Sequence, residues 1–154
     1  MTSRRNFLIA AGGFAGGMRL LSASRRAHAT PDEMQEAIRK VIGPSRVRSG
    51  RVKLDLPPLI DNGNSVSLSV AVESPMTPAD HVKAIHVFTE KNPLPNVVSV
   101  YLGPRAGRAS IATRVRIADT QTVTAIAEMS DGSFWSGSMN VVVTLSACLE
   151  DGLI

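Results

Sequence analysis

The sequence predicts an all-β fold, an antiparallel β-sandwich of about seven short strands preceded by one short N-terminal helix. Three observations predict it. Apolar residues recur at helical spacing between residues 31 and 42, alternate with polar residues from residue 52 onward, and are divided there by turns rich in Gly, Pro and Asn. Several half-buried strands at short intervals are typical of a sandwich or a small barrel. Their number and spacing favour an immunoglobulin-like sandwich over a barrel.

The helix is expected directly after residue 29. Thr30 can cap it, Pro31 suits the first helical position, and Glu33 completes a capping box. Gly43-Pro44 ends it. The apolar stripe of this helix comprises Met34, Ala37, Ile38, Val41 and Ile42.

The strands follow, each bounded by turn residues. The Asp131-Gly132 turn is typical of a hairpin that joins the last two. Scattered methionines are expected to fill the core or loops: Met76, Met129 and Met139. The expected strands span residues 52–56, 66–72, 82–89, 97–102, 111–117, 121–129 and 134–145.

The first 29 residues resemble a twin-arginine export signal. Arg4-Arg5 precede a weakly apolar stretch, and Ala27-His28-Ala29 is a small-x-small cleavage site before Thr30. The apolar stretch is too short and too interrupted to span a membrane. We therefore expect a periplasmic protein, exported by the twin-arginine route, with no stable membrane association.

The basic charge of the chain belongs to this signal. The formal net charge is +4, but five arginines and no acidic residue precede residue 30. The remainder holds 17 − 5 = 12 Lys and Arg against 13 Asp and Glu, a net charge of −1. This balance does not support binding to nucleic acid.

Neither a metal nor a cofactor is expected. His81 and His86, the only histidines after the signal, lie five residues apart on a strand and so point to opposite faces. We expect them to be ordinary surface or hydrogen-bonded side chains. A blue-copper site needs two histidines with its cysteine, and no histidine follows Cys148.

Cys148 is the only cysteine. No local motif of a cysteine hydrolase surrounds it, and Glu150-Asp151 is expected to be a solvated tail that disfavours the thiolate slightly. A free cysteine is often buried, but this one follows the expected end of the last strand. A thiol that is accessible but not activated fits a passive carrier that another protein loads.

Four segments resemble SoxY, the sulfur carrier family of bacterial thiosulfate oxidation. They are "KLDLPPLIDNGNSVSLSVAVESPMT", "HVKAIHVFTEKNPLPNVVSVYLGP", "TRVRIADTQTVTAIAEMSDGSFW" and "VVVTLSACLEDGLI". The resemblance implies an immunoglobulin-like fold, a SoxZ-like partner subunit exported with the carrier, and a C-terminal arm that presents a cysteine. By position, Cys148 would be the carrying thiol.

The resemblance also implies that partner enzymes perform the chemistry while the carrier itself is not an enzyme. A haem cytochrome would join thiosulfate oxidatively to the thiol, giving cysteine S-thiosulfonate. A metal-dependent hydrolase would then release sulfate. In some organisms a molybdenum sulfur dehydrogenase would oxidise the remaining sulfur.

The arm departs from the family pattern, which reads Gly-Gly-Cys-Gly-Gly. Here Ser146 and Ala147 precede the cysteine, and the bulkier Leu149 and Glu150 follow it. Glycine makes an arm slim and conformationally free, so this arm is stiffer. Two hypotheses therefore stand: a sulfur carrier, or a SoxY-like binding or assembly module that no longer carries substrate. The expected organisation is a signal over residues 1–29, a sandwich domain with its helix over 30–145, and an arm over 146–154.

Overall fold

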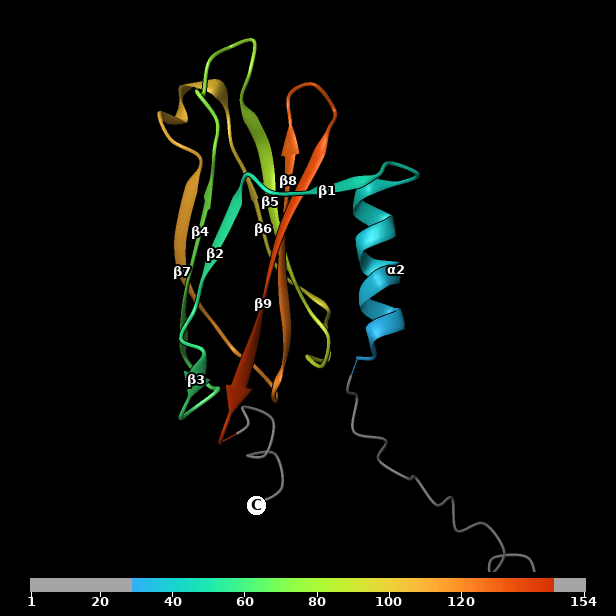
Figure 1. The fold of residues 1–154 in the computed structure, drawn as a ribbon, viewed down its shortest axis with the longest axis vertical. Coiled ribbons are helices and arrows are strands. Elements are labelled where there is room, and N and C mark those ends of the chain that lie inside the picture. Colours follow the sequence, from blue (N-terminus) through green and yellow to red (C-terminus); the bar gives the residue numbers. More distant parts are fainter. Residues whose placement is uncertain (1–28, 146–154) are drawn as a thin grey trace, which may run out of the picture.

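The computed structural model describes residues 29–145, and its N-terminal helix begins at the predicted cap (Figure 1). This helix is α2 (Pro31–Ile42). The backbone N–H of Glu33 donates to Thr30 Oγ1 at 3.3 Å, and the Thr30 N–H donates to Glu33 Oε2 at 2.8 Å. At the other end Gly43 has a φ of 61°, and its N–H donates to the Arg39 carbonyl. The predicted helix and its capping box are confirmed.

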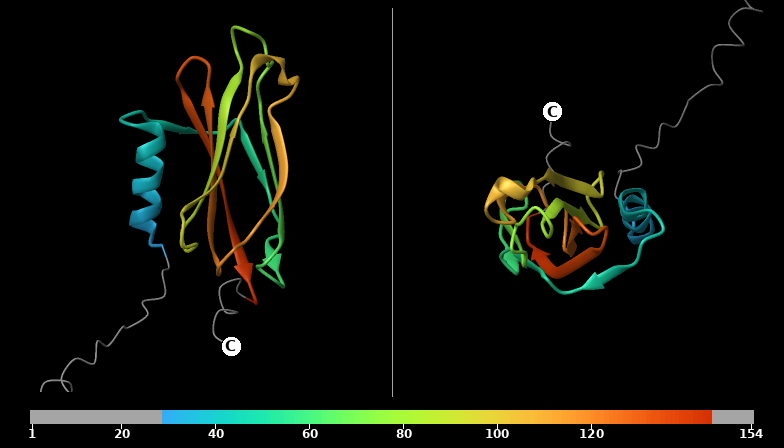
Figure 2. Two further views of the ribbon diagram at one scale, coloured as in Figure 1. Left: turned by 180° about the vertical axis from the view of Figure 1, so that it is seen from behind. Right: turned by 90° about the horizontal axis from the view of Figure 1, so that it is seen from above.

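Within the described residues, nine strands form two sheets that pack face to face (Figures 1 and 2). The larger sheet has the order β1-β9-β8-β5-β6, with β3 also paired to β9, and the smaller has the order β2-β4-β7. The predicted immunoglobulin-like sandwich is confirmed. The strands are β1 (Val47–Ser49), β2 (Val52–Asp55), β3 (Leu59–Ile60), β4 (Val66–Val72), β5 (Val82–Thr89), β6 (Asn96–Tyr101), β7 (Ser110–Val115), β8 (Gln121–Met129) and β9 (Phe134–Val143).

The main core lies between the two sheets. In β4 every second residue from Val66 to Val72 is buried and the residues between them are exposed, as the alternation predicts. Strands β5 and β8 are buried at almost every position, because a second layer covers their other face. Met76 and Met129 are buried in this core and Met139 packs against it, which confirms their expected role.

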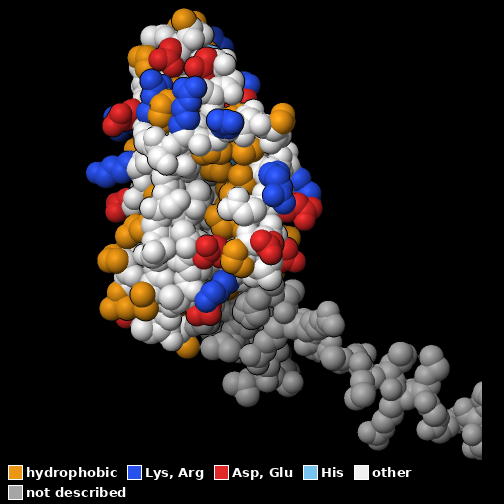
Figure 3. Space-filling view, turned by 45° about the vertical axis from the view of Figure 1, so that its right-hand side comes forward, with side chains coloured by type: hydrophobic (Ala, Val, Ile, Leu, Met, Phe, Trp, Pro, Cys, Tyr) orange, Lys and Arg blue, Asp and Glu red, His pale blue; other side chains and the backbone are white. Residues whose placement is uncertain are grey.

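Helix α2 forms this second layer on the outer face of the larger sheet. Met34 and Ile38 pack there against Phe88, Ile126 and Phe134, and Figure 3 shows apolar side chains along a seam of the displayed face. A helix of 12 residues is marginal alone in water. The apolar contact with the sheet therefore stabilises α2. No helix of residues 29–145 is long and apolar enough to cross a lipid bilayer.

The chain changes sheets at a tight corner between β1 and β2. Gly50 has a φ of 112° and Arg51 a φ of 57°. The Val52 N–H donates to the Gly50 carbonyl at 2.7 Å, which closes the turn. Strand β2 then crosses β9 so closely that a Cβ on Gly137 would lie 2.4 Å from the Val52 carbonyl oxygen. Only glycine fits this crossing without displacing backbone.

Strands β1 and β3 add to the seven predicted strands, and both pair with β9 in parallel. With three and two residues they are too short to show a period in the sequence. The last predicted strand also ends earlier than expected, at Val143. After Val143 the Thr144 N–H still donates to Ile60, the last residue of β3, and the Leu145 carbonyl accepts from the Gly63 N–H in the loop that follows β3.

Candidate functional site

The predicted carrier cysteine lies outside the described residues. The same is true of every residue of its arm and of the twin-arginine pair. Of the predicted cleavage pair, Ala29 is buried and Thr30 caps α2. The last residue that the structure describes before Cys148 is Leu145. The predicted site residues outside residues 29–145 are Arg4, Arg5, Ser146, Ala147, Cys148, Leu149 and Glu150.

The backbone is held firmly up to Leu145. The Thr144 N–H donates to the Ile60 carbonyl at 3.0 Å, and the Gly63 N–H donates to the Leu145 carbonyl at 2.9 Å. The Thr144 hydroxyl also donates to the Asp61 carbonyl at 3.0 Å. These bonds join the chain after β9 to the loop that contains β3. Thr144 and Leu145, the base of the C-terminal segment, are thus held by one bond that the backbone donates and one that it accepts.

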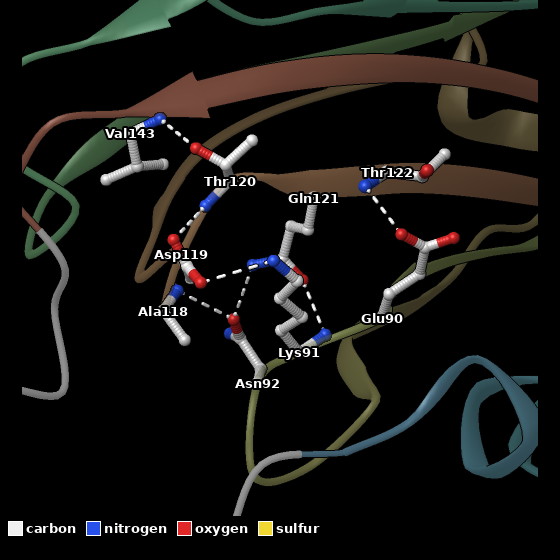
Figure 4. Close-up of polar contacts among 9 residues, drawn as sticks. All are labelled: Glu90, Lys91, Asn92, Ala118, Asp119, Thr120, Gln121, Thr122 and Val143. Carbon is white, nitrogen blue, oxygen red and sulfur yellow. Dashed lines mark hydrogen bonds and ion pairs between the residues drawn. The ribbon is translucent and has the colours of Figure 1, made fainter.

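A buried amide organises the loops at this end of the sandwich (Figure 4). Asn92 is 7% exposed, and its Oδ1 accepts from the Ala118 N–H at 2.9 Å and from Gln121 Nε2 at 3.0 Å. Its Nδ2 donates to the Arg116 carbonyl at 2.7 Å. Gln121 Oε1 in turn accepts from the Lys91 N–H at 2.7 Å. All polar groups of the Asn92 side chain are therefore bonded between the β5–β6 and β7–β8 loops.

The same network reaches the last residue of β9. Thr120 lies in the β7–β8 loop that Asn92 holds, and its hydroxyl oxygen accepts from the Val143 N–H at 3.0 Å (Figure 4). Asn92, Thr120 and Gln121 were not predicted as site residues, because the partners described above lie 23 to 30 positions away in the chain. Their only local signal was the predicted loop around residues 92–96.

Three exposed apolar side chains lie near the base of the C-terminal segment. Leu59 is 58% exposed, and Val142 and Leu145 are each 50% exposed. Leu59 and Val142 are direct neighbours in the pairing of β3 with β9. Single exposed apolar residues are common on protein surfaces, but these lie together where the C-terminal segment begins.

Both histidines are hydrogen-bonded, as expected, but they do not share a strand: only His86 lies in β5, and His81 precedes it. Nδ1 of His81 lies 3.1 Å from the Thr77 carbonyl oxygen, in the loop before β5. His86 is buried in β5, with its Nδ1 2.8 Å from Ser99 Oγ and its ring against that of Tyr101. Among residues 29–145, no group of three or more His, Cys, Asp or Glu side chains is placed to hold a metal ion.

His86 should make the fold less stable in mild acid. Burial lowers the pKa of His86, and the charge of Glu128 opposes this only partly. The unfolded chain therefore binds a proton that the folded chain excludes, so stability is fully present above about pH 6.5 and falls as the pH drops below that value. Urea unfolding at about pH 7.5 and about pH 5.5 measures the loss.

The comparison with His86→Gln separates this effect from acid titration of carboxylates. The acid-induced loss should shrink in His86→Gln, whose amide can still bond Ser99, and should persist in the control His81→Gln. An equal loss in both variants and in the unmodified chain would show that His86 does not contribute.

Comparison with known proteins agrees with this architecture. A family model described as sulfur oxidation protein SoxY matches residues 38–148. No curated protein matches the chain. The solved structure of the sulfur carrier protein SoxY from Chlorobium limicola f thiosulfatophilum matches with a TM-score of 0.62 and 23% identity, covering 74% of this chain and 98% of that one.

Other solved structures share the sandwich. A superoxide reductase (neelaredoxin) from Ignicoccus hospitalis matches with a TM-score of 0.54 and 17% identity, over 76% of this chain and 95% of that one. A superoxide reductase from Nanoarchaeum equitans matches with a TM-score of 0.52 and 10% identity, over 62% of this chain and all of that one. At these identities the structures show a common fold alone. The family model, in contrast, covers most of the chain, from the middle of α2 to Cys148, and the chain therefore belongs to the SoxY family of sulfur oxidation proteins.

Proposed function

We propose that this protein is a periplasmic sulfur carrier that binds thiosulfate-derived sulfur covalently on Cys148. The observation that carries the proposal is the extent of the family match, which runs through residue 148 and so includes the only cysteine of the chain. The similar structure from Chlorobium limicola is named a sulfur carrier protein. Cys148 is the only cysteine in this sequence and so has no disulfide partner within it.

The fixed position of Leu145 supports this role. Its carbonyl is bonded to Gly63, and Cys148 follows three residues later. Three residues span at most about 10 Å, so the thiol stays close to one end of the sandwich. An enzyme that docks at this end could therefore meet the thiol at a defined place. Leu59 and Val142 offer exposed apolar contacts beside it.

The loading step joins two sulfur atoms. The Cys148 thiol loses its proton, its sulfur bonds to the outer sulfur of thiosulfate, and two electrons pass to an oxidant. We propose a partner haem cytochrome as that oxidant. Water then attacks the terminal sulfonate in a partner hydrolase, which releases sulfate and a proton and leaves a persulfide on Cys148. The carrier supplies only the thiol, so the catalysis belongs to its partners.

We also propose a stable partner subunit and export to the periplasm. A SoxZ-like subunit would form a heterodimer with this sandwich, and the cytochrome, hydrolase and sulfur dehydrogenase would bind in turn. The signal over residues 1–29 would direct export by the twin-arginine route, with cleavage before Thr30. Residues 146–154 would form the arm.

The alternative is a SoxY-like binding or assembly module, and the composition of the arm favours it. Leu149 and Glu150 stand where the family has glycines, and both add bulk beside the thiol. A narrow active-site channel shaped for glycine would exclude them. In this alternative the protein would keep its partners but stay unloaded.

Intact-mass analysis distinguishes the two. Protein purified from cells supplied with thiosulfate should carry adducts whose masses equal added sulfur or thiosulfate groups, and a reductant should remove them. An unmodified mass in every preparation, with the partner enzymes present, would support the module and contradict the carrier.

The bulk after the cysteine should slow loading. The double substitution Leu149→Gly with Glu150→Gly should increase the rate of adduct formation by partner enzymes about tenfold. This is the effect expected if the two side chains raise the activation free energy of loading by about 1.4 kcal/mol. Reaction with a small disulfide reagent is the control and should change much less. Equal rates of enzymatic loading would mean that the partners accept this arm as it is.

A further inference from the structure

A pocket of about 700 Å³ lies at the other end of β9 from the C-terminal segment. It separates the chain after α2 from the β8–β9 turn. Arg46 and Arg48 line one side, and Asp131 and Ser133 line the other. Figure 3 shows Lys and Arg side chains grouped beside apolar atoms near the top of the displayed face, with Asp or Glu side chains next to them. The pocket is far larger than one small oxyanion needs.

Two arginines lie over a single tryptophan next to this pocket. The guanidinium carbon of Arg48 is 5.6 Å from the centroid of the Trp135 ring, and that of Arg51 is 4.8 Å from it. The pairing of β1 with β9 places Arg48 beside Trp135. Arg51 is placed by the corner, where its φ is 57°. Gly50 lies against the same ring, since a Cβ there would be in van der Waals contact with it at 3.8 Å.

The positive charge of this corner exceeds the negative charge near it. Arg46, Arg48 and Arg51 are all exposed, and no ion pair of theirs occurs among the described residues. The nearby carboxylate, Asp131, accepts hydrogen bonds from Ser133 Oγ at 2.6 Å and from the Ser133 N–H at 2.8 Å. The Ser133 hydroxyl, then its backbone N–H, lower the pKa of Asp131, and Arg48 and Arg51 lower it further. Asp131 is thus ionised and engaged in its own turn. A second acidic residue, Glu73, lies beside Arg51, because its N–H donates to the Arg51 carbonyl at 2.8 Å. Three arginines therefore stand against two acidic residues at this corner.

We propose that this surface, Arg46, Arg48, Arg51 and Trp135 with the adjoining pocket, docks an acidic segment of a partner protein. Charge complementarity selects the occupant, because excess arginine attracts carboxylates and pairs with them in two-pronged geometry. Tryptophan and arginine are also the side chains that most often dominate the binding energy of protein interfaces. The size of the pocket favours several acidic side chains over one inorganic ion.

The arginine corner lies at the opposite end of the sandwich from the C-terminal segment, so two partners can bind at the same time. Strand β9 has 10 residues, so its two ends are about 30 Å apart. A partner held at the arginine corner therefore leaves the base of the C-terminal segment uncovered. The inference goes beyond the proposed carriage of sulfur and does not depend on it.

Titration of the full chain with a hexaglutamate peptide at low salt tests the proposal. Trp135 is the only tryptophan, so its fluorescence reports binding at this corner alone. We expect a saturable change in that fluorescence. The double substitution Arg46→Gln with Arg48→Gln should weaken peptide binding about fivefold, as expected for the loss of two exposed ion pairs. The matched control is Arg105→Gln, an exposed arginine elsewhere, which should leave the affinity unchanged.

Three results would overturn the proposal. The first is a Trp135 fluorescence that shows no saturable change at peptide concentrations up to about 1 mM, the range of weak binding. The second is an equal loss of affinity in Arg105→Gln and in the double variant, with unfolding midpoints unchanged. The third is binding of inorganic sulfate as tightly as the peptide at equal ionic strength, which would indicate a site for small anions.

Discussion

Cys148→Ser should abolish covalent sulfur loading. A serine hydroxyl is close in size to the thiol but cannot form a sulfur–sulfur bond, and it does not ionise near neutral pH. The substituted protein should therefore show no sulfur adduct by intact mass after incubation with thiosulfate and the partner enzymes. Electron transfer from thiosulfate to the cytochrome, where it depends on the carrier, should fall to background.

The control for Cys148→Ser is its stability. Urea unfolding should give the same midpoint and slope as for the unmodified chain, so that a loss of loading cannot be ascribed to a loss of fold. Reducible sulfur adducts that persist in Cys148→Ser would contradict the assignment of the carrying residue. They could not arise on another cysteine, because the chain has none.

Gly137→Ala should destabilise the sandwich by about 3 kcal/mol, a large effect for one methyl group. The added Cβ would lie 2.4 Å from the carbonyl oxygen of Val52 and 3.2 Å from its carbonyl carbon. These are backbone atoms, so relief requires β2 to move away from β9. That movement would disturb the corner at Gly50 and the packing between the sheets.

Gly103→Ala is the matched control. Gly103 has a φ of −113°, and a Cβ there would meet nothing within 4 Å. Its substitution should change the free energy of unfolding by less than about 0.5 kcal/mol. Urea unfolding of both variants measures the difference. Equal stabilities would mean that the β2–β9 crossing adapts freely.

Much of the fold could be predicted because its determinants are local. The cap of α2 needs only Thr30 and Glu33, three residues apart, and both of its hydrogen bonds form. The bounds of β4, β5 and β8 match the prediction, because alternating or continuous apolar residues end there at turn residues. Strands β1 and β3 could not be predicted, because they exist only through pairing with the distant β9.

The contacts around the candidate sites also could not be predicted, because they join residues that are far apart in the sequence. The lone Cys148 can be identified from the sequence, since an isolated cysteine and the family resemblance suffice. The bond between Thr120 and Val143, by contrast, depends on how β7 turns into β8. The contact of Arg48 with Trp135 depends on the register of a strand of three residues. Such positions follow from the packed sandwich and leave no periodic signal.

The most direct test of the account is to locate the transferred sulfur. The full chain, its partner enzymes and thiosulfate labelled with heavy sulfur at the outer position would be incubated together, and the C-terminal fragment analysed by mass spectrometry. The account predicts the label on Cys148, retained as a persulfide after sulfate is released and removed by reductant. Turnover of thiosulfate by the same enzymes, dependent on this protein but with no label at Cys148 at any time, would contradict it.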